Sequence, residues 1–265
     1  MTKTPPRFPA TLGARTESRK GDVLRPQRLL HERAQEDQRR SVPSGLGLDS
    51  QAVRQRMVQR LHADGLRCDP VLQAFATVPR HHFVDTALAT QAYEDTSLPI
   101  GLGQTISKPS VVARMLELGF GGDTARATGR LGRVLEIGTG CGYQTALLAL
   151  LATRVLSIER LKPLHDKARE NLAGWRQGDV RLVWGDGRAG HAPRAPYDTI
   201  IAAAGGDDLP PAWLEQLAEG GRLVAPMHDA ASGGQVLVVV DRRGGMLQRS
   251  LQDAVHFVPL RSGTE

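Results

Sequence analysis

The sequence has too few of several residues to belong to some common protein classes. It has two cysteines, Cys68 and Cys141, in 265 residues, which excludes a disulfide-rich secreted protein and favours a reducing compartment, the cytoplasm. No Cys and His spacing typical of a metal site occurs, so we expect no metal. The longest strongly apolar run, residues 146–152, is far shorter than the roughly 20 residues that cross a bilayer, and no secretory signal is evident, so we expect no membrane association.

Positive charge is concentrated at the start of the chain. The net charge of +6 and a pI near 9.8 would suit a nucleic-acid binder. However, residues 1–48 hold ten of the 34 Lys and Arg and five of the 28 Asp and Glu, which leaves the remainder nearly neutral. Residues 1–48 are also rich in proline and poor in large apolar side chains. We therefore expect a mostly disordered basic extension, followed by one domain at 49–265.

The basic extension has three possible interpretations. Its composition favours a solvated segment without a role over a weak electrostatic tether to acidic partners. Its arginines also resemble those of an organellar transit peptide, although the five acidic residues argue against that assignment.

From Asp49 the pattern changes to regular elements. The first predicted helix is capped by Asp49-Ser50 and ends at Gly65, and the second starts at the cap Asp69-Pro70 and is broken at Val78. Further helices are predicted at 111–118, 145–152, 163–172 and 211–218. Predicted strands lie at 134–137, 154–159, 180–184, 197–204, 222–226, 235–241 and 254–260. Residues 93–109 are predicted to form a long loop.

The alternation of strands and helices predicts an α/β fold. We expect a doubly wound, mainly parallel sheet with an N-terminal helical cap. The short turn Arg242-Arg243-Gly244-Gly245 predicts that the last two strands form an antiparallel hairpin at the edge of the sheet.

Ligands of such sheets bind beyond the carboxyl ends of the strands. The glycine-rich segment 136–142 follows the first strand of this sheet, and its glycines allow a tight turn and close approach of a ligand. Glu159, at the end of the next strand, is placed to accept hydrogen bonds from both hydroxyls of a ribose. Asp186, in Gly185-Asp186-Gly187 after the third strand, is placed to accept one from an adenine amino group. These positions predict a nucleoside site.

The glycine spacing separates two kinds of cofactor. Dinucleotide sites have the pattern G-x-G-x-x-G, whereas Gly138, Gly140 and Gly142 follow G-x-G-x-G. No tyrosine has a lysine four residues later, so the Tyr-x-x-x-Lys pair of one reductase class is absent. A cofactor without a pyrophosphate fits better, which points to S-adenosylmethionine. The glycine loop alone is weak evidence, because ordinary turns also use glycine.

Together with the preceding loop, these residues resemble the protein-L-isoaspartate (D-aspartate) O-methyltransferase family. The resemblance covers about Val53 to Leu260. The motifs that carry it are Val78-Pro79-Arg80 with Phe83-Val84, Ala92-Tyr93-Glu94-Asp95, Leu98-Pro99-Ile100-Gly101, Gly103-Gln104-Thr105-Ile106-Ser107, residues 134–143, Ser157-Ile158-Glu159-Arg160, Gly185-Asp186-Gly187, Ala195-Pro196-Tyr197-Asp198, Gly220-Gly221-Arg222-Leu223-Val224 and Phe257-Val258-Pro259-Leu260.

The resemblance implies the S-adenosylmethionine-dependent methyltransferase fold and methylation of the free α-carboxylate of L-isoaspartyl residues. The partners would be damaged proteins and peptides, repaired through a succinimide, and we expect a monomer that binds neither nucleic acid nor membrane. Ser107 matches the position of the active-site serine. The expected cofactor-binding residues are Glu136, Gly138, Thr139, Gly140, Gly142, Glu159, Arg160, Asp186 and Gly187.

Two departures and two alternatives stay open. Lys108 stands where Gln or a small residue is usual, and it either attracts the substrate carboxylate or is a solvated lysine. Gly205-Gly206 leaves the substrate contacts after the fourth strand undefined. One alternative is a methyltransferase for a small molecule or a nucleic acid, although an aromatic content of 4% is low for a base-flipping site. The other is a non-catalytic module whose basic extension binds acidic polymers.

Overall fold

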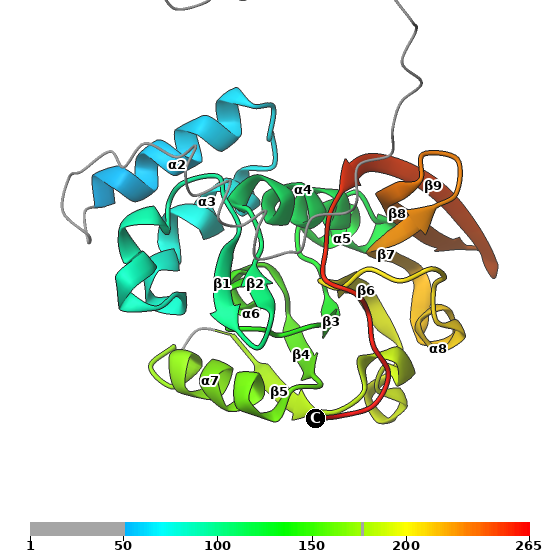
Figure 1. Ribbon diagram of the computed structural model, residues 1–265. Helices are drawn as coiled ribbons and strands as arrows, with labels where there is room; N and C mark the ends of the chain where they lie inside the picture. Colours follow the sequence, from blue (N-terminus) through cyan, green and yellow to red (C-terminus); the bar gives the residue numbers. More distant parts are fainter. Residues whose placement is uncertain (1–50, 176–177) are drawn as a thin grey trace, which may run out of the picture.

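The computed structural model describes residues 51–175 and 178–265 (Figure 1). The predicted basic extension, residues 1–48, and the predicted caps Asp49 and Ser50 lie outside the described residues. Within the described part of the chain, no helix is both long and apolar enough to cross a membrane.

The centre of the fold is a seven-stranded sheet in the order β5-β4-β3-β6-β7-β8-β9. Neighbouring strands from β5 to β7 pair in parallel, whereas β7–β8 and β8–β9 pair antiparallel. The predicted mainly parallel sheet with an antiparallel edge is therefore confirmed. The strands are β3 (Arg133–Ile137), β4 (Arg154–Glu159), β5 (Val180–Trp184), β6 (Tyr197–Ala202), β7 (Leu217–Asp229), β8 (Gly234–Arg243) and β9 (Met246–Val255).

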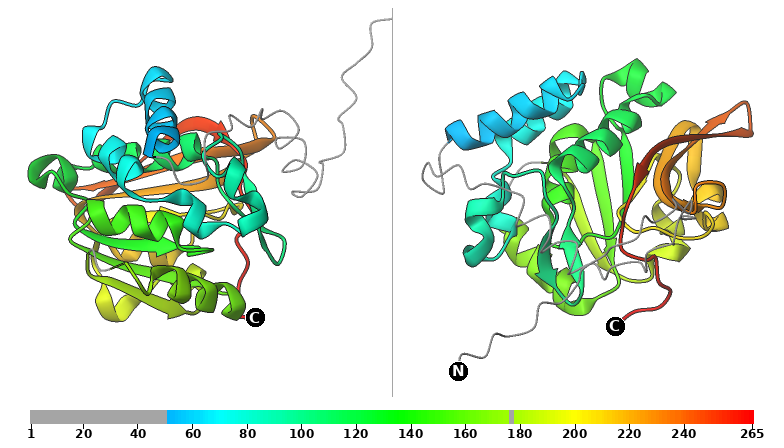
Figure 2. Two further views of the ribbon diagram at one scale, coloured as in Figure 1. Left: turned by 90° about the vertical axis from the view of Figure 1, so that its left-hand side faces the viewer. Right: turned by 45° about the horizontal axis from the view of Figure 1, so that its top comes forward.

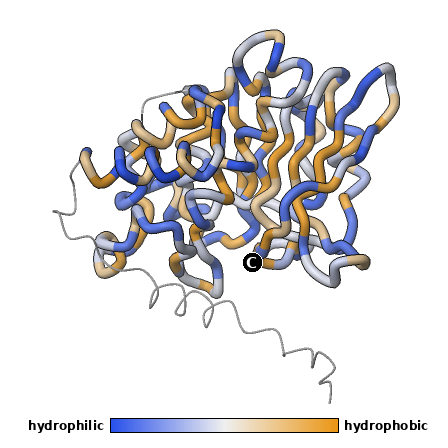
Figure 3. Tube along the Cα trace, turned by 90° about the horizontal axis from the view of Figure 1, so that it is seen from above, coloured by the Kyte–Doolittle hydropathy of each residue, from blue (hydrophilic) through white to orange (hydrophobic). Residues whose placement is uncertain are grey.

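A separate apolar core lies on each face of the sheet. Side chains alternate along a strand, so Val134 joins one core while Leu135 and Ile137 join the other. The first core is covered by α4 (Pro109–Phe120), α5 (Asp123–Thr128), α6 (Tyr143–Leu151) and α7 (Lys162–Leu172). On the second face, α8 (Pro211–Glu215) contributes the fully buried Trp213. The apolar colouring of the central strands in Figure 3 reflects this burial on both faces.

The predicted helical cap is formed by α2 (Gln51–Ala63), α3 (Asp69–Thr77) and the short 3-10 helices η1 (Arg80–Phe83) and η2 (Thr86–Gln91). It packs beside α4 and α6 (Figure 2). The rings of Phe75 and Phe83 pack in T-shaped geometry with that of Tyr143, the first residue of α6, at centroid distances of 6.1 and 5.6 Å. The cap thus rests on the residue that follows the glycine-rich segment.

Four local predictions were wrong. The helix expected at 211–218 ends at Glu215, because Leu217 and Ala218 already belong to β7. Residues 93–109 are not only a loop, because β1 (Leu98–Gly101) and β2 (Gln104–Ile106) pair as a small hairpin that the short strands and the glycines concealed. Asp69 is the first residue of α3, not its cap, which is Cys68. The strand expected at 254–260 ends at Val255, because β9 pairs with β8 from the Gly244-Gly245 turn onward.

The segment 256–265 crosses the carboxyl end of the sheet instead of extending β9. It forms an isolated bridge between Pro259 and Gly205, and Glu265 reaches the start of α7, where its carbonyl accepts a hydrogen bond from the Lys162 N–H. In Figure 1 this segment is the red chain that runs from β9 to the end marked C. It therefore forms one wall of the space beyond the strands.

Candidate active site

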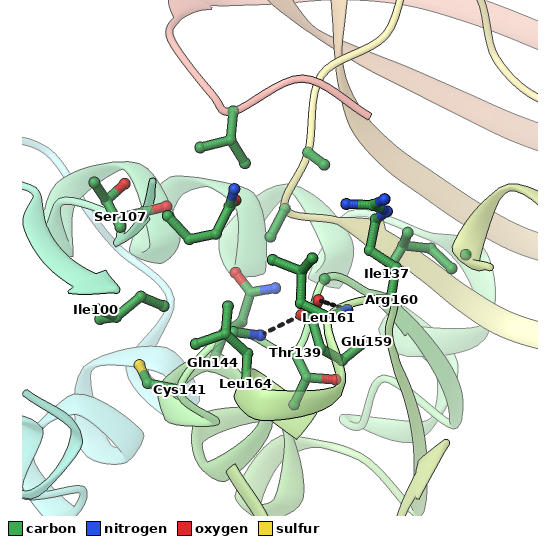
Figure 4. A pocket seen from close by; sticks show the side chains of 18 of the residues that line it. Ile100, Ser107, Ile137, Thr139, Cys141, Gln144, Glu159, Arg160, Leu161 and Leu164 are labelled. Carbon is green, nitrogen blue, oxygen red and sulfur yellow. Dashed lines mark hydrogen bonds between the residues drawn. The ribbon is translucent and has the colours of Figure 1, made fainter. Parts of the chain in front are cut away.

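One pocket lies beyond the carboxyl ends of β3 and β4 (Figure 4). Its walls come from the β1–β2 hairpin, the glycine-rich segment, the end of β4, and residues 258–261. The side chains of Ser107 and Ile100 lie on one side, and those of Glu159 and Arg160 lie on the other. Seven of the predicted site residues line this pocket: Ser107, Gly138, Thr139, Gly140, Glu159, Arg160 and Gly187.

The glycine-rich segment uses its own N–H groups within the protein. Gly138 and Thr139 donate to the Ile158 carbonyl at 2.9 and 3.3 Å, and Gly142 donates to the Thr139 carbonyl at 2.9 Å. The Gly140 N–H donates to Glu159 Oε2 at 2.9 Å. Because these donors are occupied, the segment does not present the row of free N–H groups that holds a pyrophosphate. This geometry fits a nucleoside cofactor without a pyrophosphate.

Left-handed backbone explains why these positions are glycine. Gly140 has φ of 56°, and a Cβ there would stand 3.2 Å from Ile100 Cδ1 at the pocket wall. Gly142, with φ of 91°, does not line the pocket. A Cβ on Gly142 would stand 3.1 Å from Leu172 Cδ1, so the left-handed backbone and the close packing against α7 both favour glycine at this position.

Glu159 is the carboxylate at the centre of the pocket wall. It is 6% exposed, Oε1 accepts a hydrogen bond from the Leu161 N–H at 3.0 Å, and Oε2 accepts the one from Gly140. A carboxylate oxygen can accept a second hydrogen bond. Glu159 therefore fixes the glycine-rich segment and still offers acceptor sites to a ligand.

Glu136 does not reach the pocket, contrary to the sequence prediction. It lies within β3, fully buried, and accepts hydrogen bonds from Gln144 Nε2 at 3.0 Å and Thr145 Oγ1 at 2.5 Å. Burial raises the pKa of its carboxyl group to about 7. Glu136 therefore ties the first turn of α6 to β3 from within the protein.

Asp186 is also outside the pocket lining. Its Oδ1 accepts a hydrogen bond from the Arg188 N–H at 2.8 Å, and its Oδ2 accepts one from the Gly263 N–H at 2.7 Å. Arg160, which does line the pocket, donates to the Gly263 carbonyl at 3.1 Å and pairs with Glu265 at 2.7 Å. The predicted adenine acceptor thus binds the segment that crosses the site, a contact that no local sequence pattern signals.

On the opposite wall, Ser107 follows β2 directly and precedes α4. Its backbone carbonyl accepts a hydrogen bond from Arg80 Nη2 at 2.8 Å. Cys141 lines the same pocket, and burial raises the pKa of its thiol, so it remains protonated. Cys141 therefore serves as a small side chain in the pocket wall and not as a nucleophile.

Several pocket residues were not predicted. Gln144 lines the pocket while it donates to Glu136, and residues 258–261 enter it from the far end of the sequence. The family resemblance includes the motif Phe257-Val258-Pro259-Leu260, and this motif was the signal that could have placed residues 258–261 in the site.

The structure accounts for Gly205-Gly206. Gly205 donates to the Val258 carbonyl at 2.8 Å and accepts from the Leu260 N–H at 2.6 Å, and a Cβ on it would stand 2.4 Å from Gln235 Nε2. Gly205 therefore holds the crossing segment in place, whereas Gly206 pairs with β7, where its carbonyl accepts a hydrogen bond from the His228 N–H at 2.8 Å. Lys108 is half-buried at the start of α4 but does not line the pocket.

Comparison with known proteins gives one consistent family. The model of the family described as Protein-L-isoaspartate(D-aspartate) O-methyltransferase matches residues 52–265. A protein-L-isoaspartate O-methyltransferase of Methylibium petroleiphilum is 64% identical over an alignment of 264 positions that covers 98% of this chain and 97% of that one. The corresponding protein of Leptothrix cholodnii is 62% identical over 242 residues, 91% of this chain and 84% of that one.

Solved structures agree with the fold. One protein-L-isoaspartate O-methyltransferase matches with a TM-score of 0.68 at 29% identity, over 78% of this chain and 65% of that one. A Plasmodium falciparum structure with a similar description, solved in complex with S-adenosyl-L-homocysteine, matches with a TM-score of 0.65 at 22% identity, over 78% of this chain and 98% of that one.

Proposed function

The chain belongs to the protein-L-isoaspartate(D-aspartate) O-methyltransferase family, and we propose that its reaction takes place in the pocket between Glu159 and Ser107. The enzyme transfers a methyl group from S-adenosyl-L-methionine to the free α-carboxylate of L-isoaspartyl residues in damaged proteins and peptides. The observation that supports this location is that the glycine-rich segment, Glu159 and Ser107 line one cavity.

The cofactor side of the pocket comprises the glycine-rich segment, Glu159, Arg160 and Gly187. When bound, S-adenosylmethionine supplies an electrophilic methyl group on a sulfonium. Glu159 accepts hydrogen bonds from the ribose hydroxyls, each charged hydrogen bond contributing about 1.5–3 kcal/mol. Gly138 and Gly140 let the ligand approach the backbone.

The substrate side of the pocket is organised around Ser107. A carboxylate is ionised at pH 7, so the reaction needs no strong general base. The Ser107 hydroxyl donates a hydrogen bond to one carboxylate oxygen and leaves the other free to attack. Because an anion and a cation become neutral products, a closed site of low polarity favours the reaction, and the apolar side chains of Ile100, Ile106 and Val258 in the lining provide one.

The methyl ester that the enzyme forms reacts further on its own. The methyl ester closes to a succinimide without help from the protein, and hydrolysis of this ring returns part of the damage to normal aspartate.

We further propose that the enzyme acts as a monomer in the cytoplasm, without binding nucleic acid. Both cysteines are free thiols, which supports a reducing compartment.

Methyl transfer to matched peptides tests the proposal. The labelled methyl group of S-adenosylmethionine is offered to an isoaspartyl peptide and to its normal aspartyl twin, and only the isoaspartyl peptide should become labelled. Equal labelling of both peptides would reject the substrate. Labelling of a small molecule or of RNA in preference to either peptide would favour the alternative methyltransferase.

A further inference from the structure

We propose that Arg80 is a positioning residue for the transfer, holding Ser107 where its hydroxyl meets the substrate carboxylate. This inference rests on the role of Ser107 under the proposed function. It assigns a task to a side chain that does not line the pocket and is itself fully buried at 0% exposure.

The partners of Arg80 are carbonyl groups. Its Nε donates to the Ala92 carbonyl at 2.7 Å and its Nη2 to the Ser107 carbonyl at 2.8 Å. Within residues 51–175 and 178–265, no carboxylate forms an ion pair with it. A buried charge without a counter-ion costs free energy, so a guanidinium is a costly way to satisfy two carbonyls unless the geometry it imposes is needed.

The guanidinium joins segments that the chain keeps apart. Ala92 begins the segment 92–95, Ser107 ends the β1–β2 region, and Arg80 itself lies in η1 of the cap. The guanidinium carbon also lies 4.8 Å from the ring centroid of Tyr143, a pocket-lining residue at the start of α6. A planar fork with fixed donor directions can hold these parts in one arrangement.

The surroundings keep Arg80 charged and rigid. Burial lowers the pKa of its guanidinium, yet arginine stays protonated in proteins. The neighbouring Tyr143 side chain opposes this shift in the pKa of Arg80. The hydrogen bonds to the Ala92 and Ser107 carbonyls, together with this contact to Tyr143, fix Arg80, and through the Ser107 carbonyl Arg80 fixes the backbone of Ser107.

Arg80→Lys provides the main test, because lysine keeps the charge but loses the fork. We expect kcat for an isoaspartyl peptide to fall by about tenfold, because a small misplacement of a reacting group is costly. The dissociation constant of S-adenosyl-L-homocysteine should change by less than about twofold, because the donors that hold the glycine-rich segment are untouched. Unchanged kcat would overturn the proposal, and so would an equal loss of cofactor affinity.

A double-mutant cycle separates positioning from a merely structural role. In the Ser107→Ala background, Arg80→Lys should lower kcat by less than about twofold, since the hydroxyl that Arg80 positions is gone. An equal loss in both backgrounds would reject the assignment of Arg80. Should Ser107→Ala alone leave kcat unchanged, the role of Ser107 in the proposed function fails, and the inference about Arg80 fails with it.

Arg60→Lys is the matched control. Arg60 is another cap arginine, which donates from Nη2 to the Tyr93 carbonyl and pairs with Glu94 in the same segment, but within the described part of the chain it forms no hydrogen bond with Ser107. This variant should keep kcat within about twofold, as expected of a part-exposed contact. If Arg80→Lys does not fold, Arg80→Gln, which keeps one donor group, replaces it in the same double-mutant cycle. The circular dichroism spectrum and a cooperative thermal unfolding transition identify the folded variants independently of cofactor binding.

Discussion

The two sides of the pocket are built in different ways. The cofactor side is local, because residues 136–145 and 157–161 come from adjacent parallel strands and the turns that follow them. The substrate side combines Ser107, which follows the β1–β2 hairpin, with residues 258–261 from the end of the sequence. Arg80 of the cap supports Ser107 from outside the pocket. Substitutions on the two sides should therefore affect different measurements, cofactor affinity on one side and turnover on the other.

Glu159→Ala should give the largest change, on the cofactor side. It removes two acceptors for the ribose and the partner of the Gly140 N–H, so we expect cofactor binding to weaken by about 2–4 kcal/mol. Calorimetric titration with S-adenosyl-L-homocysteine measures this loss, with Glu159→Gln as the variant that keeps the shape. An affinity within threefold of the wild type would show that Glu159 does not contact the ribose.

Glu136→Gln should reveal that the buried carboxyl group of Glu136 makes the free energy of unfolding depend on pH. The carboxyl group has a pKa of about 7 in the fold against 4.5 for the ordinary group, so the folded protein favours the protonated form. Relative to the non-titrating Gln variant, the wild type should lose stability as the pH rises from 4.5 through 7, by up to about 3 kcal/mol.

Urea unfolding of wild type and Glu136→Gln at pH 5 and pH 8.5 measures this difference. Glu170→Gln, at an exposed position of α7, serves as the control and should show no such trend. A constant difference between wild type and Glu136→Gln across this range would mean that the buried carboxyl group does not take up a proton on folding.

Ser107→Ala should affect the substrate side alone. Loss of one hydrogen bond to a charged oxygen, about 1.5–3 kcal/mol, predicts a fall in turnover of at least about tenfold. The affinity for S-adenosyl-L-homocysteine should stay the same, because Ser107 lies across the pocket from Glu159. A large loss of cofactor affinity would move Ser107 to the cofactor side and remove the distinction between the two walls.

Lys108→Gln should have the smallest effect. Lys108 does not line the pocket, so its ammonium can act on the substrate carboxylate only at a distance, and a partly exposed charge contributes about 0–1 kcal/mol. We expect the peptide KM to change by less than about twofold at low salt. A several-fold rise in KM that disappears at high salt would instead support direct attraction by Lys108.

The sequence was sufficient to predict those parts of the fold and the site that follow from the pattern of neighbouring residues. The glycine-rich segment and Glu159 each follow a short apolar strand, so their positions at the carboxyl end of the sheet could be predicted. The hairpin at 98–106 could not, because strands of four and three residues interrupted by proline and glycine leave too little periodicity.

Two sets of contacts at the candidate site could not be predicted, for a common reason. Glu136 and Asp186 lie at strand ends, as predicted, but what their carboxylates contact depends on other segments. Thr145 and Gln144 turn Glu136 inward, and the Gly263 N–H binds Asp186. Only the folded chain shows that residues 256–265 return to this edge of the sheet, so neither contact follows from local spacing.

A crystal structure with S-adenosyl-L-homocysteine and an isoaspartyl peptide tests the central claim most directly. We predict that both ligands occupy one cavity, with the ribose hydroxyls on Glu159 and the isoaspartyl carboxylate about 2.5–3.0 Å from Ser107 Oγ. A peptide carboxylate bound away from Ser107, or a ribose that does not touch Glu159, would contradict the account.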